Sequence, residues 1–432
     1  MAHESTPLLK ATPLFAVFDR LDFDFWPSLL DVYTLNLKGV NLSSKTTYIY
    51  SAKRTPVGAF NGALSGFSAP QLGAIAIKAA METSGFNSDQ IQECLMGQVL
   101  PAGAGQAPAR QSWIGAGGAT STGCMTINKV CGSGLKAVML ADDSIRLGRS
   151  QAVMCGGQES MSQAPYLLPQ AHNGYRMGNG QVIDSMVHDG LWDPYNNWHM
   201  GNAAELCVKE YKFTREEQDQ FAENSYKKAQ AAQGQGVFAE ELVKVELTSR
   251  GTTTTVDTDE EPGKARFDKI PTLRPAFEKD GTITAANASK INDGAAALVL
   301  GNEDFKGTHK PLARILAQAT FAQDPKWFTT APVGAIKKAL ENAKLSVNDI
   351  DLWEINEAFS AVTMAAQRDL KIADEKVNVY GGAVAIGHPI GASGARIFTT
   401  LLHALNSKDK QLGLATLCIG GGEAVAVIVE RV

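Results

Sequence analysis

The sequence predicts an α/β protein made of two similar halves, with a subdomain inserted into the first half. Three observations lead to this prediction. Short β-rich runs alternate with helical segments along residues 47–161, and the alternation returns along residues 306–432. Three sequence landmarks of the first region recur in the third in the same order. Between the two regions, residues 162–283 form a polar stretch that is too long for a connecting loop.

Length and composition limit the class of protein. A chain of 432 residues exceeds one ordinary domain of roughly 100–200 residues, so two or three folded units are expected. The net charge of −5 gives no reason to expect nucleic acid as a partner. No run of about 18 or more apolar residues appears, so no membrane span is expected. The six cysteines form no CxxC pair, which argues against a zinc site or a disulfide framework and favours a reducing compartment.

Residues 1–46 differ from the rest because they are dense in aromatic and acidic residues, and they receive no structural assignment. A mitochondrial transit peptide would be rich in arginine, whereas Arg20 is the one arginine here. The chain ends in Glu-Arg-Val and carries no Ser-Lys-Leu terminus. We therefore expect a cytoplasmic protein, with a mitochondrial location as the main alternative.

The first half is predicted to begin near Thr47 with a short strand that ends in a turn. Residues 70–83 then have the apolar spacing of an amphipathic helix, and residues 94–100 form an apolar run typical of a buried strand. Residues 132–148 are predicted to be a helix of small and apolar residues, followed by a strand that begins at Ala152. The strand predicted at 295–300 returns after the polar stretch, so residues 284–305 are expected to complete this half.

The three repeated landmarks suggest a duplicated unit. Gln98 and Asn356 each follow a predicted strand. Some 30 residues later, Cys131 opens one glycine-rich helix and the segment at His388 opens another. The sequence Val-Met-Cys-Gly-Gly-Gln-Glu that contains Cys155 is then echoed by the sequence Thr-Leu-Cys-Ile-Gly-Gly-Gly-Glu near the end of the chain. Chance similarity between glycine-rich strand ends is the alternative explanation.

Cys131 is the first candidate for chemistry. It lies in the segment Asn-Lys-Val-Cys-Gly-Ser-Gly, where a strand turns into a helix. Unpaired N–H groups and the positive end of a helix dipole both favour a thiolate at such a place. Gly132 and Gly134 leave room for a ligand to approach the backbone. The alternative is a buried structural cysteine, which is a common role for this residue.

His388 is the candidate general base. It lies in the segment Gly-Gly-Ala-Val-Ala-Ile-Gly-His-Pro-Ile-Gly-Ala-Ser-Gly. Few structural reasons require a histidine among so many small residues, whereas a base that must reach both a thiol and a substrate needs such an open setting. The alternative is a loop histidine bonded to nearby backbone.

Cys418 and Asn356 are weaker candidates when each is taken alone. Cys418 ends a strand at a glycine turn, but its counterpart Cys155 shows that a cysteine in such a sequence can be core. Asn356, in Glu-Ile-Asn-Glu-Ala-Phe, could hold a catalytic water or could cap the next helix. All four candidates follow strand ends, and ligands bind at that edge of α/β sheets.

On these motifs the sequence resembles the thiolase family. The similarity covers nearly everything from residue 47 to 432 and rests on Asn-Lys-Val-Cys-Gly-Ser-Gly, Asn-Glu-Ala-Phe, Gly-His-Pro and Cys-Ile-Gly-Gly-Gly, in the family's order. The resemblance implies two α/β halves in a layered α-β-α-β-α arrangement, with residues 162–283 as a loop domain that binds coenzyme A (CoA). It also implies a reversible Claisen condensation in which two acetyl-CoA give acetoacetyl-CoA and CoA through an acetyl-cysteine.

The resemblance also implies a role for each candidate. Cys131 would attack the thioester and become acylated, and His388 would accept its proton. Cys418 would act as acid or base on the α-carbon of the second acetyl-CoA. Asn356, through a water, and His388 would stabilise the enolate oxygen. The backbone N–H groups of Cys131 and Gly420 would form the oxyanion hole.

Further family positions imply how the substrate binds. His199 and Met200 match the pair that lines the pantetheine tunnel and shortens the acyl pocket in short-chain members, and Ser289 matches a serine that contacts CoA. Many bacterial members place an arginine before the position of Lys269, where this chain has Gly-Lys-Ala-Arg-Phe-Asp-Lys. Lys264, Arg266 and Lys269 replace its charge, but lysine lacks the planar fork of arginine. Which of the three meets the nucleotide is therefore open.

Some members of the family bind potassium, and five positions here match their site. No tightly bound cofactor is expected besides this ion, and CoA acts as substrate and product. The matching positions are Tyr226, Ala285, Ala286, Ala288 and Val384. For Tyr226 the alternative is simply the buried side of a helix.

Two other kinds of protein compete with a thiolase. Ketosynthases share the fold but need no second catalytic cysteine, so Cys418 argues against them. A non-catalytic binder of lipid or acyl-CoA would be expected to lose Cys131 or His388, and this chain keeps both. The partners expected are acetyl-CoA, acetoacetyl-CoA and CoA. A homotetramer built from two dimers is expected, with a dimer as the alternative.

Overall fold

A computed structural model describes residues 45–249 and 251–432. The unassigned stretch predicted at residues 1–46 lies outside this part except for its last two residues. The described residues are organised around a ten-stranded sheet with the order β14-β15-β16-β13-β1-β12-β5-β3-β4, in which β2 pairs with β12. Its strands are β1 (Tyr48–Arg54), β2 (Gly58–Ala59), β3 (Glu93–Gly97), β4 (Gly123–Ile127), β5 (Ala152–Ser160), β12 (Asn292–Gly301), β13 (Ala313–Ala322), β14 (Leu352–Ile355), β15 (Leu412–Ile419) and β16 (Glu423–Arg431).

The strand order shows the duplication directly. Outward from the centre, one half runs β1-β12-β5-β3 and the other runs β13-β16-β15-β14. In each half the last two strands of this series pair in parallel and the others pair antiparallel. The halves meet where β1 pairs with β13 over two residue pairs. The prediction of two similar α/β halves is therefore confirmed.

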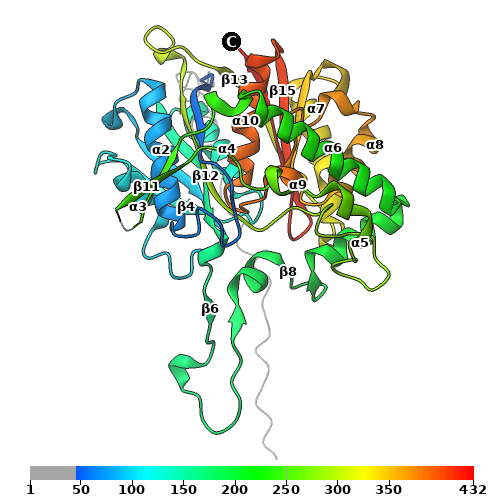
Figure 1. Cartoon of the computed structure of the whole chain (residues 1–432). Helices are drawn as coiled ribbons and strands as arrows, with labels where there is room; N and C mark the ends of the chain where they lie inside the picture. The colour runs from blue at the N-terminus through cyan, green and yellow to red at the C-terminus, as the bar shows by residue number, and fades with distance from the viewer. Residues whose placement is uncertain (1–44, 250) are drawn as a thin grey trace, which may run out of the picture. The chain divides into compact units, whose positions relative to one another are not determined.

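Helices form three layers around the strands, as Figure 1 shows. Helices α2 (Ala69–Ser84) and α3 (Pro108–Gly115) cover the outer face of the first half, and α7 (Ala331–Ala343) and α8 (Ser360–Leu370) cover the second. Helices α4 (Ser133–Arg146) and α10 (Ser393–Ser407) lie between the halves and share one large core with both. This is the predicted α-β-α-β-α layering.

The two central helices touch through their backbones. A Cβ atom added at Gly134 would lie 2.7 Å from the backbone nitrogen of Ala395, and one added at Gly394 would lie 2.4 Å from that of Leu135. Distances this short exclude any larger residue, because real Cβ atoms do not approach backbone so closely. The glycines therefore let the two helix N-termini meet, and the segments that carry Cys131 and His388 meet with them.

Local signals explain why the elements begin and end where they do. The N-cap of α2 is Ser68, whose backbone N–H donates to Gln71 in a capping box, and the helix ends at Gly85 with φ of 75°. Along β5 all nine residues are buried, since Val153 faces the central helices while Met154 faces α2. The helix predicted at 70–83 and the strand predicted at 295–300 are confirmed as α2 and β12.

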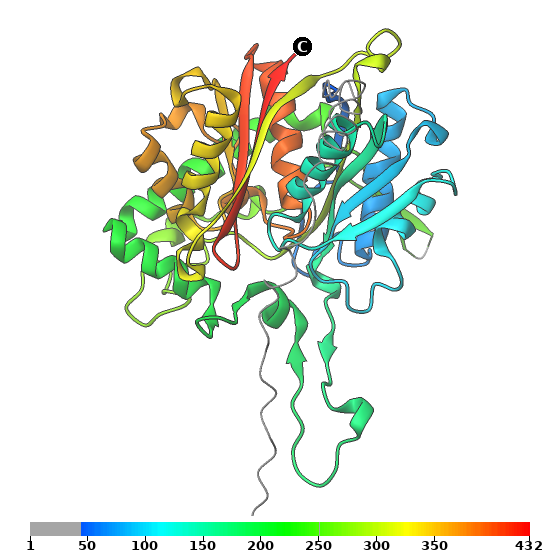
Figure 2. The same ribbon diagram turned by 180° about the vertical axis from the view of Figure 1, so that it is seen from behind.

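The inserted residues lie between β5 and β12, which are direct antiparallel neighbours. They form α5 (Met200–Tyr211), α6 (Arg215–Gly234) and three two-stranded sheets: β6 (Tyr166–Leu167) with β7 (Ile183–Asp184), β8 (Trp192–Asp193) with β9 (Trp198–His199), and β10 (Val245–Ser249) with β11 (Thr252–Val256). The β6–β7 hairpin extends away from the layered part, as both Figure 1 and Figure 2 show. Within the described residues, no helix is long and apolar enough to cross a membrane.

Candidate active site

Cys131 lies in a strained turn just before α4. Val130 has φ of 46°, which is unusual for a β-branched residue and typical of backbone held for a function. Three polar contacts hold it: Asn128 Oδ1 accepts from the N–H of Val130 (2.9 Å), Ser133 Oγ accepts from the N–H of Lys129 (2.8 Å), and Ser133 Oγ donates to the carbonyl of Val130 (2.7 Å). The turn therefore presents the Cys131 thiol in a fixed direction.

Burial decides the protonation state of Cys131. It raises the pKa of the thiol to about 11, although the backbone N–H groups of Gly420 and of Cys131 itself donate to the sulfur and oppose the rise. The backbone N–H groups therefore favour the thiolate, as predicted, but desolvation outweighs them in the free protein. The two N–H groups assigned to the oxyanion hole nevertheless both point at this sulfur.

His388 is buried and is oriented from both sides. Its backbone N–H donates to Asn292 Oδ1 (2.9 Å), and its ring Nδ1 lies 2.5 Å from Ser393 Oγ. Because the Ser393 hydroxyl donates to the carbonyl of Pro389 (2.8 Å), the serine oxygen accepts from Nδ1–H. That leaves Nε2 unprotonated and free to take a proton. Burial, helped by the charge of Arg396, lowers the pKa of His388 to about 3, so the ring is neutral.

Cys418 and Asn356 lie behind these residues, fully buried at the ends of β15 and β14. Burial raises the pKa of Cys418 well above its ordinary value, and charge on Cys131 raises it further, so the two thiols lie close enough for their charges to interact. Neither Nδ2 nor Oδ1 of Asn356 has a hydrogen-bond partner within the described residues. Helix α8 takes Phe359 as its N-cap, so the capping alternative for Asn356 is wrong.

An apolar cavity of about 210 Å³ joins these groups to the insertion. Cys131, His388 and Gly420 line its inner end, and His199, Met200 and Ser289 line its wall. The His199 ring is fixed, because Nδ1 accepts from the N–H of Gly201 (3.0 Å) and the ring stacks on Phe277 with 4.8 Å between centroids. These six predicted residues therefore meet in one cavity, whereas the predicted Cys418 and Asn356 do not line it.

A more open cavity of about 440 Å³ continues this one outward. The two share Phe277, Ser289 and Ile291, and Lys264 lies on the outer wall. Arg266 and Lys269 instead lie near Asp268 on the surface, with nitrogen to oxygen distances of 3.8 and 3.7 Å. Of the three basic residues predicted to meet the nucleotide, Lys264 is the one that lines a cavity leading to the thiol.

The residues matched to a potassium site surround an amine. Lys290 Nζ donates to the carbonyls of Ala288 (3.0 Å) and Val384 (3.4 Å) and lies 5.6 Å from the ring centroid of Tyr226. Ala286 is buried beside them and Ala285 is exposed. Since an ammonium group already uses two of the carbonyls that the ion would need, the five positions Tyr226, Ala285, Ala286, Ala288 and Val384 do not fit potassium as they stand.

Three positioning residues escaped the sequence analysis: Ser393, Glu159 and Glu357. Glu159 accepts from the N–H groups of Val99 (2.9 Å) and Gly391 (2.9 Å), which fixes the loop after His388. For the two carboxylates the one sequence signal is position, since Glu159 ends one of the repeated landmarks and Glu357 directly follows Asn356.

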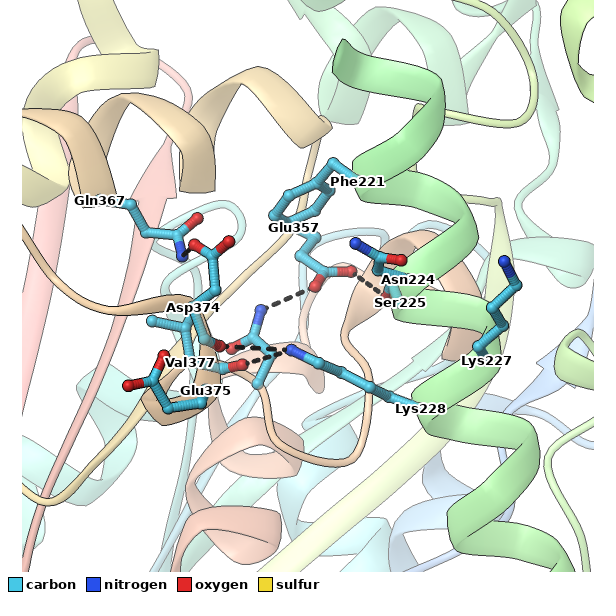
Figure 3. A pocket seen from close by; sticks show the side chains of 11 residues that line it. Phe221, Asn224, Ser225, Lys227, Lys228, Glu357, Gln367, Asp374, Glu375 and Val377 are labelled. Atoms are coloured by element: carbon cyan, nitrogen blue, oxygen red, sulfur yellow. Dashed lines mark hydrogen bonds between the residues drawn. The ribbon is translucent and has the colours of Figure 1, made fainter. Parts of the chain in front are cut away.

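Glu357 ties three segments together. Its carboxylate accepts from Ser225 Oγ (2.7 Å), Asn378 Nδ2 (2.8 Å) and the N–H of Val384 (3.1 Å), and Figure 3 shows it between α6 and the chain near Val377. Burial raises the pKa of Glu357. The adjoining cavity of about 400 Å³ is lined by neither of the catalytic candidates Cys131 and His388, so we assign the chemistry to the apolar cavity instead.

Comparisons with known proteins agree with this geometry. A family model described as the thiolase N-terminal domain matches residues 47–304, and one described as the thiolase C-terminal domain matches residues 309–431. An acetyl-CoA acetyltransferase from Cupriavidus necator is 52% identical over 389 residues, which cover 89% of this chain and 98% of that protein. One from Escherichia coli is 50% identical over 391 residues, with 90% and 99% covered.

Solved structures give the same result. A thiolase from Ascaris suum in complex with coenzyme A is 44% identical and superposes with a TM-score of 0.85, covering 90% of this chain and all 100% of the other. An acetyl-CoA acetyltransferase from Bacillus anthracis is 37% identical with a TM-score of 0.89, covering 91% and 100%. With both family domains matched in order, and with Cys131 and His388 lining one cavity, the chain belongs to the thiolase family.

Proposed function

We propose that this chain is an acetyl-CoA acetyltransferase, an acyltransferase that interconverts two acetyl-CoA with acetoacetyl-CoA and CoA. The observation that carries the proposal is that Cys131 and His388 share one apolar cavity while Cys418 neighbours the Cys131 sulfur. Two thiols and a base at one carbonyl are what acyl transfer followed by carbon–carbon bond formation requires.

The first half-reaction acetylates Cys131. His388 Nε2 takes the thiol proton as the sulfur attacks the thioester carbonyl. Because the pKa of the thiol is raised, the proton leaves only when a substrate is there to be attacked. The N–H groups of Cys131 and Gly420 stabilise the oxyanion, and losing one such donor typically costs about 10²–10³ in rate. The tetrahedral intermediate then collapses, the bond to CoA sulfur breaks, and Cys418 protonates the departing thiolate.

The second half-reaction forms the carbon–carbon bond. The Cys418 thiolate removes a proton from the methyl carbon of a second acetyl-CoA, and the enolate attacks the acetyl carbonyl on Cys131. Asn356, through a water, and His388 stabilise the enolate oxygen. The Cys131 thiolate leaves and regains its proton from His388. Each group has then returned to its starting state, so protons balance in both directions.

The same cavity favours short acyl groups. Met161, Leu191 and Phe328 close it around Cys131, and Met200 approaches the backbone near Gly420 (3.7 Å from a Cβ built there). An acyl chain longer than a few carbons would have to displace these side chains from a cavity of about 210 Å³. Displacing packed apolar groups is costly because protein interiors are close-packed.

Coenzyme A enters through the outer cavity in this proposal. Ser289 lies where the inner and outer cavities meet, so it contacts the pantetheine arm, and Lys264 on the outer wall meets a phosphate. The complex of the Ascaris suum thiolase with coenzyme A supports CoA as the ligand. A lysine meets phosphate as a point charge, without the paired hydrogen bonds of arginine.

We further propose a homotetramer built from two dimers. The β6–β7 hairpin exposes several large apolar side chains: Tyr166 (67% exposed), Leu168 (53%), Met177 (104%) and Val182 (61%). The edge strand β4 exposes Met125 (53%). Apolar side chains on a projecting hairpin and on a free strand edge suit two different contacts between copies. Light scattering after gel filtration tests this, and Met177→Glu together with Leu168→Glu should yield a dimer.

The decisive assay is cleavage of acetoacetyl-CoA by the purified protein with free CoA. A long-chain 3-ketoacyl-CoA is tested alongside, with Cys131→Ala as the inactive variant and Cys94→Ala, which alters a buried cysteine of the outer core, as the matched control. Cleavage of acetoacetyl-CoA alone, lost in Cys131→Ala and kept in Cys94→Ala, is the expected result. Equal use of the long chain would contradict the short-chain assignment. No cleavage by folded protein would overturn the enzymatic function.

A further inference from the structure

The amine of Lys290 lies at the junction of two segments that build the active site. Its Nζ donates to the carbonyl of Ala288 (3.0 Å) and to that of Val384 (3.4 Å). Ala288 and Val384 are 96 positions apart in the chain. The lysine therefore joins two distant segments of the chain through hydrogen bonds. The Nζ also lies 5.6 Å from the ring centroid of Tyr226 on α6, within the usual range of a cation–π contact.

Both segments lead directly to groups that the chemistry needs. Ser289 follows Ala288, and its backbone N–H donates to the carbonyl of Ala358 (3.0 Å), two residues after Asn356. Val384 belongs to the short helix α9 (Ala383–Ile386), which ends two residues before His388. Pulling the two carbonyls together therefore fixes the distance between the CoA-binding side and the general base.

Burial opposes a positive charge at this point and lowers the pKa of Lys290 to about 8, whereas the carboxylates of Glu261 and Glu357 favour the charge. Two backbone carbonyls direct their negative ends at the Nζ, and the ring face of Tyr226 adds to them. Burial and then the carboxylates Glu261 and Glu357 raise the pKa of the Tyr226 phenol, which shows that acidic groups lie close to this cluster. With a pKa of about 8 the amine of Lys290 is mostly protonated at neutral pH, so the chain itself supplies a cation between these carbonyls.

A monovalent metal ion cannot share the place. Two unit charges at about 3 Å repel strongly, by more than 1 kcal/mol even at the dielectric constant of water. The ion would also need the carbonyl oxygens that Lys290 already occupies. Metal and ammonium are therefore alternatives at this position.

We propose that Lys290 is the built-in cation of this active site, a positioning residue whose ammonium group takes the place of a monovalent metal ion between the carbonyls of Ala288 and Val384. The proposal rests on the acetyltransferase function for its kinetic consequences, because it assigns Ser289 and His388 to one substrate site. Its structural consequence, independence from potassium, does not depend on that function.

The test compares thermal unfolding and acetoacetyl-CoA cleavage in KCl, NaCl and choline chloride at equal ionic strength. The unfolding midpoint and KM of the unaltered protein should be the same in all three salts. Lys290→Ala opens space for an ion, so its midpoint in NaCl or choline chloride should fall by about 2–4 °C, and its KM for CoA should rise about threefold to tenfold. Potassium should restore both values with a saturable dependence on concentration.

Two further variants keep the result clear if Lys290→Ala is too unstable to study. Lys290→Met keeps the apolar stem and fills the space without a charge, so it should lose stability equally in all three salts and resist rescue. Lys78→Met changes an exposed lysine of α2 and should behave as the unaltered protein.

Either of two results would overturn the proposal. One is a saturable rise of the midpoint of the unaltered protein with KCl but not with NaCl, since that requires a metal beside the lysine. The other is an unchanged midpoint and KM in both Lys290→Ala and Lys290→Met. If the protein cleaved no acetoacetyl-CoA at all, the acetyltransferase proposal would fail, and the midpoints in the three salts would still decide the role of Lys290.

Discussion

The two halves place similar residues at matching points and use them differently. Gln98 follows β3 and is fully bonded: its Oε1 accepts from Gln158 (3.0 Å) and its Nε2 donates to the carbonyl of Leu100 (3.2 Å). Asn356 follows β14, and neither atom of its amide has a partner within the described chain. The first amide stabilises the fold, and the second is free for chemistry.

The cysteines repeat this contrast. Cys155 is buried in the central core on β5 among apolar neighbours, whereas Cys418 on β15 lies beside the thiol of Cys131. The duplicated fold thus supplies two equivalent sets of positions, and the candidates for chemistry are Asn356, whose amide has no partner among the described residues, and Cys418, which lies within reach of the charge on Cys131. This difference can be tested by making the same change in each half.

The largest difference is expected between Cys418→Ser and Cys155→Ala. A serine at 418 is too weak an acid to protonate the departing thiolate and too weak a base for the second acetyl-CoA, so kcat should fall by about 10²–10⁴. Cys155→Ala should leave kcat near its original value and lower the free energy of unfolding by about 1–2 kcal/mol. Steady-state cleavage of acetoacetyl-CoA and urea unfolding measure the two effects. Equal losses of activity would contradict the contrast between the halves.

Removing the side-chain amide of Gln98 should lower stability, whereas removing that of Asn356 should lower the reaction rate. Gln98→Ala leaves the buried Gln158 amide without its acceptor, which should cost about 1–3 kcal/mol of unfolding free energy with little change in kcat. Asn356→Ala removes no side-chain hydrogen bond among the residues that the structure describes, so stability should hold while kcat falls by about 10–10². A loss of stability in Asn356→Ala, seen in the same urea titration, would show that the amide is structural after all.

The architecture was predictable from sequence because its signals are local and repeated. The alternation of strands and helices follows side-chain periodicity, and the duplication can be traced through Gln98 and Asn356. The candidate catalytic residues could be proposed from sequence for a different reason, since Cys131, His388 and Cys418 occur in motifs that match one family. What pattern could not give is the net result of burial. A helix N-terminus lowers the pKa of a thiol, whereas desolvation raises the pKa of Cys131 by more, to about 11.

Contacts between residues far apart in the sequence could not be predicted from it either. Nothing near Lys290 in the sequence shows that its amine reaches Val384, because that contact depends on how the two halves close together. The bonds from Glu159 to the loop after His388 escaped prediction for the same reason. Residues that act on their neighbours in sequence were found, and residues that act across the fold were not.

The state of Cys131 can be measured by its pH-dependent reaction with iodoacetamide in the free protein. Only the thiolate reacts, so with a pKa of about 11 the labelling rate should rise about tenfold for each pH unit from pH 7 to 9 without reaching a plateau. Cys155 should remain unlabelled throughout, since burial raises its pKa further and its side chain is inaccessible. Mass spectrometry of the Cys131 peptide measures the labelling rate. A plateau of this rate near neutral pH would show that Cys131 is a thiolate in the free protein, as the helix N-terminus alone predicts.

The smallest contrast concerns the serines that begin the two central helices. Ser133 Oγ donates to the carbonyl of Val130 (2.7 Å), and Ser393 Oγ donates to that of Pro389 (2.8 Å). Ser393 also accepts from the His388 ring (2.5 Å). Both substitutions to alanine should cost about 1 kcal/mol of stability. Ser393→Ala should in addition lower kcat about tenfold, because the imidazole loses the acceptor that fixes its tautomer. Ser133 holds the turn of Cys131 and does not touch the base, so Ser133→Ala should lower kcat only through the position of the thiol. An unchanged kcat in Ser393→Ala would show that this serine does not set the tautomer of His388.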